Sequence, residues 1–275
     1  MNLLAIISDN TNYTLHSHTQ YCDGRATMDE MARAAVEQGM TVYGFTPHSP
    51  IPFDSPCNMS ADAVGDFLRE ADRIAAAYAG RCRFLKGMEV DYIGSEWGPH
   101  SEYFKSLPLD YTIGSVHFIP TQDGEPVDID GKFESFRRKM ADRFRDDIDY
   151  VVDTFFRQSM DMLAAGGFDI LGHFDKIGQN ASYYAPGIEG GSHYRGLLRQ
   201  YMDRITASGV IVELNTKAYH EHGRFFPSAA LLPELVAAGV PVVVNSDAHY
   251  PDRICAGRAE GLRALAEAAL KLTPV

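Results

Sequence analysis

The chain has 275 residues, 45% of them hydrophobic, and a formal net charge of −12 at pH 7. This length and composition predict a single domain over residues 1–275 with a large buried core. The acidic charge argues against an extended nucleic-acid interface, which needs surplus Lys and Arg, and the lack of an apolar run of membrane-spanning length argues against a membrane protein.

Strand-like and helix-like segments alternate along the chain. The first strand lies in YTLHSH and is followed by a helix that begins after Thr27, where Glu30 completes a capping box, and ends at Gly39. Further strands are predicted in MTVYGFTPHSP, CRFLKGMEVDYIG, LDYTIGSVHF, FDILGHFD, GVIVELNTK and GVPVVVNSDAH. Further helices are predicted over about 60–79, 100–106, 133–165, 192–208, 228–238 and 256–270, with a polar loop through Gly124, Pro126 and Gly131 before the longest.

Seven strands, each followed by helical sequence, indicate parallel βα units. The apolar runs VIVEL and VPVVV are typical of strands that are buried on both faces. We therefore expect an α/β fold in which the seven strands close into a (β/α)7 barrel similar to a TIM barrel. An open, doubly wound sheet is the alternative, and its ligand crevice would draw on fewer strands.

Histidines and acidic residues collect where the predicted strands end. His16 and His18 point to the same face as the first strand ends, and Asp23 follows in a turn for which Gly24 supplies permissive backbone. Six of the ten histidines lie at strand ends, where a parallel barrel places its chemistry. The remaining four, which are expected on helices and loops, are His100, His193, His220 and His222. The predicted metal donors are His16, His18, Asp23, His48, Glu89, His117, His173, Asp247 and His249.

Nine donors exceed the three or so protein ligands of one catalytic zinc ion, so two or three divalent cations are predicted. Glu89 or Asp247 is the natural bridge between two of them. Such donors accept Zn, Fe, Mn or Co. Clustered cations suit the hydrolysis of an anionic ester, because they activate a bridging water and neutralise phosphoryl charge. The chain has no P-loop, no G-x-S-x-G elbow and no H-E-x-x-H helix.

The motifs LHSHTQYCDG, GFTPHSP, KGMEVDY, GSVHF, LGHFD and NSDAH resemble the PHP (polymerase and histidinol phosphatase) family, and within it the histidinol-phosphatase branch. The resemblance covers essentially the whole chain. It implies a distorted seven-stranded barrel with a trinuclear metal centre. The implied activity is hydrolysis of L-histidinol phosphate, a step of histidine biosynthesis, by attack of a metal-bridging hydroxide.

The same resemblance implies a ligand set for each ion. The first ion would be held by His16, His18, Glu89 and Asp247; the second would share Glu89 and add His117 and His173; the third would use Asp23, His48 and His249. Glu89, Asp247 and His249 are the expected catalytic residues. Some relatives have His at the position of Asp23, and an acidic residue is frequent at that of Pro47.

Polar loop residues are candidates for binding the substrate. Lys176 and Lys217 rank first, because they lie just beyond strand ends, and Arg195 and Arg224 are further candidates for the phosphate. Asn215 and the pair Tyr183 and Tyr184 could contact an imidazole or an amine. Two other functions stay open: a phosphoesterase of the same fold for another small phosphate ester or a nucleotide, and a non-catalytic metal-binding module.

The cysteines and the N-terminal residues predict a soluble, cytoplasmic protein. The four cysteines are scattered and form no C-x-x-C pair, which argues against both a disulfide framework and a thiolate zinc site. The start MNLLAIISDN lacks the basic region and the small-residue cleavage site of a signal peptide. No feature of the sequence specifies an oligomeric state.

Overall fold

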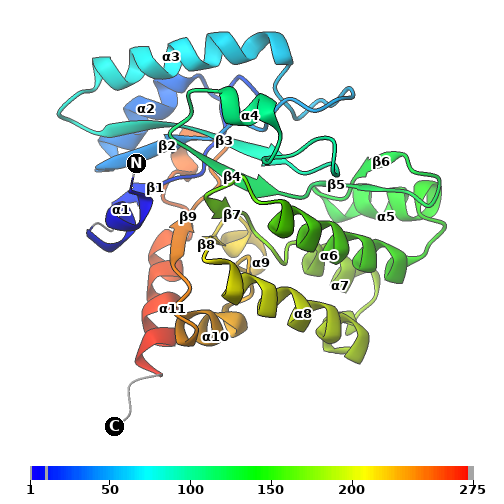
Figure 1. Cartoon of the computed structure of the whole chain (residues 1–275). Helices are drawn as coiled ribbons and strands as arrows, with labels where there is room; N and C mark the ends of the chain where they lie inside the picture. The colour runs from blue at the N-terminus through cyan, green and yellow to red at the C-terminus, as the bar shows by residue number, and fades with distance from the viewer. Residues whose placement is uncertain (1, 10–11, 272–275) are drawn as a thin grey trace.

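A computed structural model describes residues 2–9 and 12–271, and its centre is a parallel sheet in the order β1-β2-β3-β4-β7-β8-β9 (Figure 1). All six neighbouring pairs of this seven-stranded sheet are parallel. The strands are β1 (Tyr13–Thr14), β2 (Val42–Phe45), β3 (Arg83–Asp91), β4 (Tyr111–Ser115), β7 (Ile170–Leu171), β8 (Ile211–Asn215) and β9 (Val242–Asn245). Each predicted strand is present, although the first and the fifth are short.

The two edges of the sheet meet, so that it forms a nearly closed barrel. Just beyond β1 and β9, Ser17 pairs with Ala248 in a parallel bridge, and the amide of His18 donates to the carbonyl of Ala248 over 2.9 Å. Nearer the strands, the amide of Leu15 donates to Oδ1 of Asn245 over 2.8 Å. The predicted barrel is therefore confirmed, and the open doubly wound alternative is wrong.

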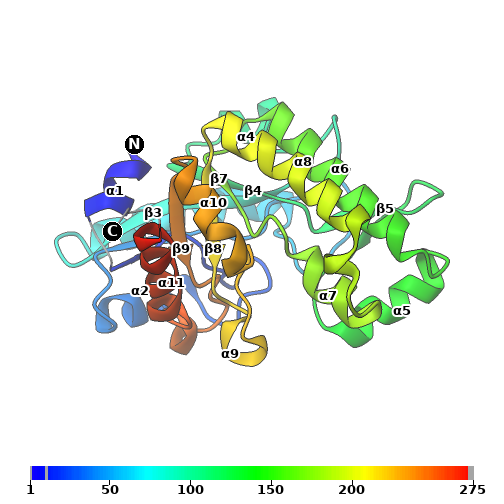
Figure 2. The same ribbon diagram turned by 90° about the horizontal axis from the view of Figure 1, so that it is seen from below.

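Helices surround the barrel on its outside. Figure 1 shows α2 and α3 over one side, and Figure 2 shows α6 and α8 side by side on one flank and α10 and α11 together on another. The helices are α1 (Leu3–Asp9), α2 (Met28–Glu37), α3 (Val64–Ala77), α4 (Glu102–Ser106), α5 (Phe133–Arg143), α6 (Ile148–Ala165), α7 (Ile177–Tyr184), α8 (Ser192–Ser208), α9 (Tyr219–His222), α10 (Leu232–Ala237) and α11 (Arg258–Leu270), with single 3₁₀ turns at Ala61–Ala63, Ile188–Gly190, Ala229–Leu231 and Pro251–Arg253. The predicted capping box at the start of α2 is present.

The structure corrects the expected helical region 133–165. It is two helices, because Arg145 and Asp146 take positive φ angles of 55° and 57° and the chain turns between α5 and α6. Asp147 then caps α6 by accepting from the amide of Tyr150 over 2.9 Å. Aromatic and apolar residues continue across this turn, which is why periodicity alone did not reveal it.

Other elements were not expected at all. The predicted polar loop contains a hairpin of β5 (Phe118–Pro120) and β6 (Pro126–Asp128), which pair antiparallel. Short helices α1, α7 and α9 occupy segments for which no helix was predicted. The last two follow β7 and β8 directly, so they lie beside the strand ends that carry the candidate site.

Tyr111 closes the inside of the barrel beneath the strand ends. Its hydroxyl donates to the carbonyl of Leu15 over 2.7 Å, and its ring is buried. Glycines on the neighbouring strands β2 and β3 leave room for this ring. A Cβ added to Gly44 would lie 1.8 Å from the Tyr111 hydroxyl, and a Cβ added to Gly87 would lie 2.6 Å from the Tyr111 ring. Tyr111 thus fills part of the barrel interior beneath the strand ends that carry the polar side chains.

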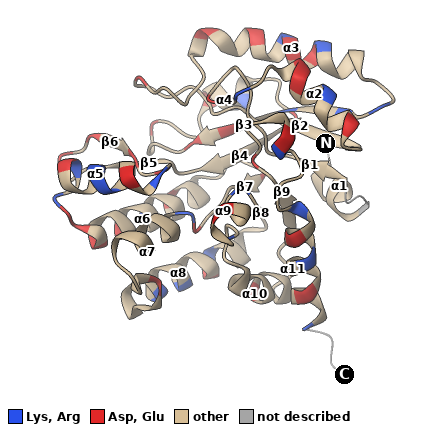
Figure 3. Cartoon of the chain, turned by 180° about the vertical axis from the view of Figure 1, so that it is seen from behind, with Lys and Arg blue, Asp and Glu red and all other residues tan. Residues whose placement is uncertain are grey.

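Charged residues of both signs are distributed along the outer helices, as Figure 3 shows for α3, α5 and α11. Several form exposed ion pairs, such as Arg199 with Glu234 and Arg73 with Asp29. Exposed pairs of this kind contribute little to stability. Within the described part of the chain, no helix has both the length and the apolar character needed to cross a membrane.

Candidate metal centre

The segment after β1 contributes three of the predicted donors. His16 and His18 are fully buried, and their ring centroids are 5.1 Å apart. The turn that brings Asp23 back toward them depends on Gly24, but not for the expected reason. Gly24 has no positive φ; instead, a Cβ there would lie 2.2 Å from the backbone nitrogen of Thr19. The close approach of two backbone segments therefore requires glycine at this position.

The structure brings all nine predicted donors together at the carboxyl end of the barrel. Glu89 lies within β3, Asp23 lies in the turn that follows β1, and the others follow β1, β2, β4, β7 and β9 by a few residues. His16, His18, Glu89, His173 and Asp247 have exposed fractions of 3% or less. None of the other four histidines is in this cluster; His193, for example, is an exposed partner of Asp153.

Glu89 lies at the middle of the cluster and faces two groups of histidines with its two carboxylate oxygens. Oε2 is 3.2 Å from Nε2 of His16 and 3.0 Å from Nδ1 of His48. Oε1 is 2.9 Å from Nε2 of His173 and 3.3 Å from Nε2 of His117. The two oxygens of this carboxylate therefore face different groups of histidines, an arrangement that would allow it to serve two ions.

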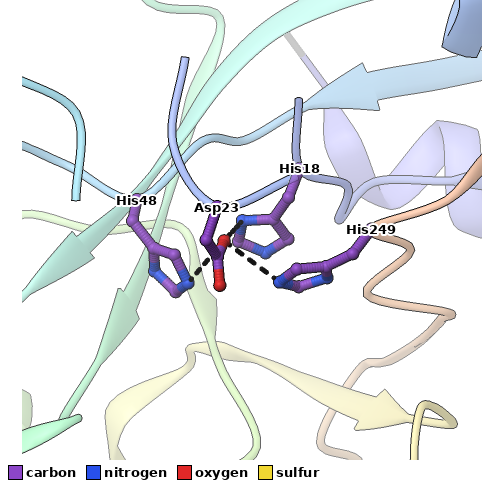
Figure 4. A group of neighbouring side chains, drawn as sticks. All are labelled: His18, Asp23, His48 and His249. Carbon is purple, nitrogen blue, oxygen red and sulfur yellow. Dashed lines mark ion pairs between the residues drawn. The ribbon is translucent and has the colours of Figure 1, made fainter. Parts of the chain in front are cut away.

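Two further groups of donors lie on the β1 and β9 side. His16, His18 and Asp247 offer atoms that all lie within 4.8 Å of one another, and Nε2 of His18 is 3.0 Å from Oδ1 of Asp247. His18, Asp23, His48 and His249 form the other group, in which the carboxylate of Asp23 lies among the three rings (Figure 4). Its Oδ1 is 3.2 Å from Nε2 of His249 and 3.8 Å from Nε2 of His48.

Unpartnered buried atoms show that this donor set fits metal ions. Nε2 of His16, Nε2 of His18, Nδ1 of His48 and Oδ1 of Asp23 are buried and have no hydrogen bond of acceptable geometry to any described residue. Buried polar atoms without partners are costly and rare in native proteins. Two ligands each about 2.1 Å from one tetrahedral ion are about 3.4 Å apart, close to the separations found here. Cations shared by these atoms would satisfy all four.

Opposite charges hold the carboxylates of the cluster in their ionised form. Burial raises the pKa of Glu89, but His16, His117 and His48 more than offset this effect, so the pKa lies well below its usual value. Burial also raises the pKa of Asp247, and Lys217 and His16 bring it well below the usual value. For His18, burial and the neighbouring His249 and His48 lower the pKa well below its usual value. Burial lowers the pKa of His16 and His117, but neighbouring carboxylates raise it well above its usual value. Because ionised carboxylates and neutral imidazoles are the forms that bind metals, these two rings would release a proton when a metal binds.

Two donors sit in strained backbone. His173 and Asp247 follow β7 and β9 by two residues and have positive φ angles of 20° and 49°. A positive φ is uncommon for residues other than glycine and concentrates at functional sites, where the surroundings enforce it. From these turns, Nε2 of His173 lies 2.9 Å from Oε1 of Glu89, and Oδ1 of Asp247 lies 3.0 Å from Nε2 of His18.

Two buried carboxylates next to the donors were not predicted from the sequence. Oδ1 of Asp91 is 2.7 Å from Nδ1 of His117, and Oε1 of Glu213 is 2.7 Å from Nδ1 of His16. A signal for each exists: Asp91 is two residues from Glu89 on the same face of β3, and Glu213 is the one charged residue in the apolar run VIVEL. Neither sequence feature indicates which side chain the carboxylate contacts.

Of the basic candidates, two lysines lie at the cluster. Nζ of Lys176 is 2.5 Å from Oδ2 of Asp130, which is itself 3.7 Å from Nε2 of His117. Nζ of Lys217 is 3.3 Å from both Oδ1 of Asp247 and Nε2 of His249. The two lysines thus lie on the β7 side and the β9 side of the donors. Asp130, in the loop after β6, was not predicted.

The other candidates have different surroundings. Arg195 is exposed in the first turn of α8, and Arg224 makes two hydrogen bonds of 2.8 and 2.7 Å to Glu189. Asn215 is buried and donates to Glu213 and Asp247, both over 3.1 Å. Its oxygen accepts from the amide of Lys217 over 3.1 Å. Both polar atoms of this side chain are therefore bound within the protein.

The two tyrosines at the end of α7 contact neighbouring elements. The hydroxyl of Tyr183 is 3.1 Å from Nδ1 of His222 on α9, and that of Tyr184 donates to Asp146 over 2.7 Å. They connect α7 to α9 and to the turn between α5 and α6. Both hydroxyls are engaged by the protein itself.

Comparisons with known proteins agree with this fold. The family model described as the PHP domain matches residues 14–217. A Deinococcus radiodurans protein is 25% identical over an alignment of 248 residues, with coverage of 87% of this chain and 86% of that protein. A Schizosaccharomyces pombe protein is 24% identical over an alignment of 256 residues, with coverage of 87% of this chain and 81% of that protein. Both carry the name Probable histidinol-phosphatase.

Two solved structures have the same fold. One is described as a candidate histidinol phosphatase from Listeria monocytogenes, with a TM-score of 0.79, 17% identity, and coverage of 90% of this chain and 99% of the other. The second is a histidinol phosphate phosphatase from Lactococcus lactis in complex with zinc, L-histidinol and phosphate, with a TM-score of 0.72, 18% identity and 94% coverage of both chains.

Proposed function

The chain belongs to the PHP domain family, and on that premise we propose that it is a metal-dependent phosphomonoesterase that hydrolyses L-histidinol phosphate to L-histidinol and phosphate. The observation that carries the proposal is the gathering of nine donors around the central carboxylate of Glu89. The proposal covers residues 1–275 as one catalytic unit. It places the protein in the cytoplasm, in the biosynthesis of histidine, in agreement with four free cysteines.

The relatives support the choice of substrate. Both sequence relatives carry a histidinol-phosphatase name and align over most of the chain. The Lactococcus lactis structure contains the two products of the proposed reaction together with zinc. A hydrolase for a different phosphate ester would keep the donors and change the loops around them.

The metal ligands form part of the proposal. We assign His16, His18, Glu89 and Asp247 to one ion, Glu89, His117 and His173 to a second, and Asp23, His48 and His249 to a third. Zn, Fe, Mn or Co fits such donors. When bound, divalent cations here would supply an activated water near neutral pH and would neutralise charge on the phosphoryl group. Glu89, Asp247 and His249 are the proposed catalytic residues among the ligands.

The residues of the chain itself bind and orient the ester. Lys176 and Lys217 present ammonium groups on two sides of the donors, where they can neutralise phosphoryl oxygens. Asp130, whose side chain is 25% exposed, adds a carboxylate beside Lys176 at the rim of the site. A cationic amine on the substrate is favoured there, and the net charge of −12 adds to this field.

Phosphate release from a panel of esters tests the proposed substrate. The metal-loaded protein is expected to hydrolyse L-histidinol phosphate with a higher kcat/KM than glycerol phosphate or an aryl phosphate, because only the first combines a small dianion with a cationic amine. A nucleoside monophosphate in the panel tests for a nucleotide substrate. Equal turnover of histidinol phosphate and the aryl phosphate would contradict the substrate but not the hydrolase. No hydrolysis of any ester would favour a non-catalytic metal-binding module.

Removing the charge of either lysine is expected to weaken substrate binding. A charged hydrogen bond contributes about 1.5–3 kcal/mol, so Lys176→Gln and Lys217→Gln should each lower kcat/KM by about 10- to 150-fold, mainly through KM. Steady-state kinetics with histidinol phosphate measures the effect. Lys105→Gln is the matched control, since Lys105 is an exposed partner of Glu102 on α4. Unchanged KM in both site variants would show that other groups bind the phosphate.

A further inference from the structure

Two buried carboxylates lie behind the rings of the proposed ligands rather than among the donor atoms. Glu213, on β8, is fully buried, and its Oε1 is 2.7 Å from Nδ1 of His16. Asp91, the last residue of β3, is 1% exposed, and its Oδ1 is 2.7 Å from Nδ1 of His117. Each carboxylate therefore contacts the Nδ1 atom of one histidine, which is the ring nitrogen that faces away from the donor cluster.

The other nitrogen of each ring faces Glu89. Nε2 of His16 is 3.2 Å from Oε2 of Glu89, and Nε2 of His117 is 3.3 Å from Oε1. A neutral imidazole binds a cation through the nitrogen that carries no proton. For Nε2 to bind, the proton must be on Nδ1, where a carboxylate accepts it.

Glu213 can act only as an acceptor, because four donors surround it. Its Oε1 accepts from His16 and from Nδ2 of Asn245 over 2.9 Å. Its Oε2 accepts from the amide of His173 and from Nδ2 of Asn215, both over 3.1 Å. A glutamine has one oxygen and one NH₂ group, so in either orientation its NH₂ would face two of these donors. The site is built for a carboxylate.

Asp91 is held in a similar way from the loop that follows β2. Its Oδ2 accepts from Nδ2 of Asn58 over 2.9 Å, and its amide donates to Oγ of Ser49 over 3.2 Å. Asn58 thus holds the carboxylate on the oxygen that does not contact His117, and Ser49 holds the backbone of Asp91. Its position depends on that loop, and the position of Glu213 depends on β7, β8 and β9.

We propose that Glu213 and Asp91 are positioning residues, each of which fixes the tautomer and orientation of one histidine, His16 and His117 respectively, so that its Nε2 binds metal. The inference rests on the metal ligands assigned under the proposed function. Since those two histidines serve different ions in that assignment, the two carboxylates act on different ions. Partners of this kind contribute about 10- to 100-fold to metal affinity.

Double-mutant cycles on metal affinity test the inference, with zinc as the probe and competition against a chromophoric chelator as the readout. Glu213→Gln is expected to weaken one class of bound zinc by about 10- to 100-fold. In the background of His16→Gln it should cause no further loss, because its effect passes through that ring. In the background of His117→Gln, the fold-loss in zinc affinity caused by Glu213→Gln should be as large as in the unsubstituted protein, so the two losses multiply. Asp91→Asn should show the reverse pattern.

The control is Glu234→Gln, which removes a carboxylate from an exposed pair with Arg199; its zinc affinity should equal that of the unsubstituted protein. Circular dichroism of each metal-free variant establishes that it is folded. If Glu213→Gln does not fold, Glu213→Asp replaces it in the same cycle, since the charge is kept but the reach is one methylene shorter.

Two outcomes would overturn the inference: unchanged zinc affinity in both variants, or equal losses in both histidine backgrounds, which would indicate a general structural role. Failure of the proposed function appears differently. In that case the unsubstituted protein would itself bind less than two zinc ions, or would bind them and hydrolyse no phosphate ester.

Discussion

Replacing Glu89 with Gln is expected to lower kcat for histidinol phosphate by about 10²- to 10⁴-fold and to weaken the binding of two ions together. The carboxylate is 1% exposed, and its two oxygens lie within 3.5 Å of nitrogens of five histidines, in two groups. Removing one partner from a buried, charged arrangement costs about 3–5 kcal/mol, and each 1.36 kcal/mol changes a rate about tenfold. Kinetics and elemental analysis of the same preparation measure both effects.

The amide cannot replace the carboxylate in this position. It carries no charge, and its NH₂ end would face either His16 and His48 or His117 and His173. The hydroxyl of Ser115 donates to Oε1 of Glu89 over 2.8 Å. An NH₂ group in place of Oε1 would face this hydroxyl and could not accept its hydrogen bond. The loss is therefore expected for both ions.

Glu96→Gln is the matched control for this variant, because Glu96 is an exposed carboxylate that follows the same strand by a few residues. It should retain full activity and metal content. A folded Glu89→Gln protein with near-normal turnover and metal content would show that another group, of which Asp247 is the first candidate, bridges the ions.

The barrel could be predicted because each strand is marked by its own residues. The runs VIVEL and VPVVV are apolar throughout, and each of the seven strands is followed by helical sequence. The elements that escaped prediction depend on single backbone turns or on packing. The break between α5 and α6 rests on Arg145 and Asp146, which are not typical residues for positive φ as glycine is.

The nine donors could be located for a similar reason. In a parallel barrel the strand ends meet in space, so His16, Glu89 and Asp247 converge although they lie far apart in the chain. The carboxylates that contact these donors, such as Glu213, are placed by the register of the strands. Glu213 is opposite Val243 in the pairing of β8 with β9, and only this register sets its carboxylate against Asn245 and His16.

The substrate side was less accessible from sequence, because it depends on which charges meet across loops. From the sequence, Lys176 ranked above Arg224 only because it lies just beyond a strand end. In the structure, Glu189 binds Arg224 with both oxygens, whereas Lys176 pairs with Asp130 beside the donors. Glu189 lies 35 residues before Arg224, so no local sequence pattern indicates that its carboxylate binds the guanidinium of Arg224.

Removal of the metals is expected to abolish activity and to lower Tm. The loaded protein should contain about two to three divalent ions per chain, since nine donors at about three per ion require that number. An ion present at about 1,000 times its Kd stabilises the folded state by about 4 kcal/mol. For a chain of this size that corresponds to about 8–16 °C in Tm for each ion lost. Elemental analysis, thermal melting and phosphate release before and after dialysis against a chelator measure the three effects.

The site explains why the folded protein loses stability without its ions. Atoms such as Nε2 of His16, Nε2 of His18 and Oδ1 of Asp23 have no hydrogen bond of acceptable geometry to any described residue, and without ions the positive-φ turns at His173 and Asp247 would lose the metal contacts proposed for their side chains. Addition of a single metal to the dialysed protein should restore both Tm and activity, which separates metal loss from irreversible unfolding. Fewer than two ions after purification with added metal, or an unchanged Tm once the ions are gone, would rule out the multinuclear centre.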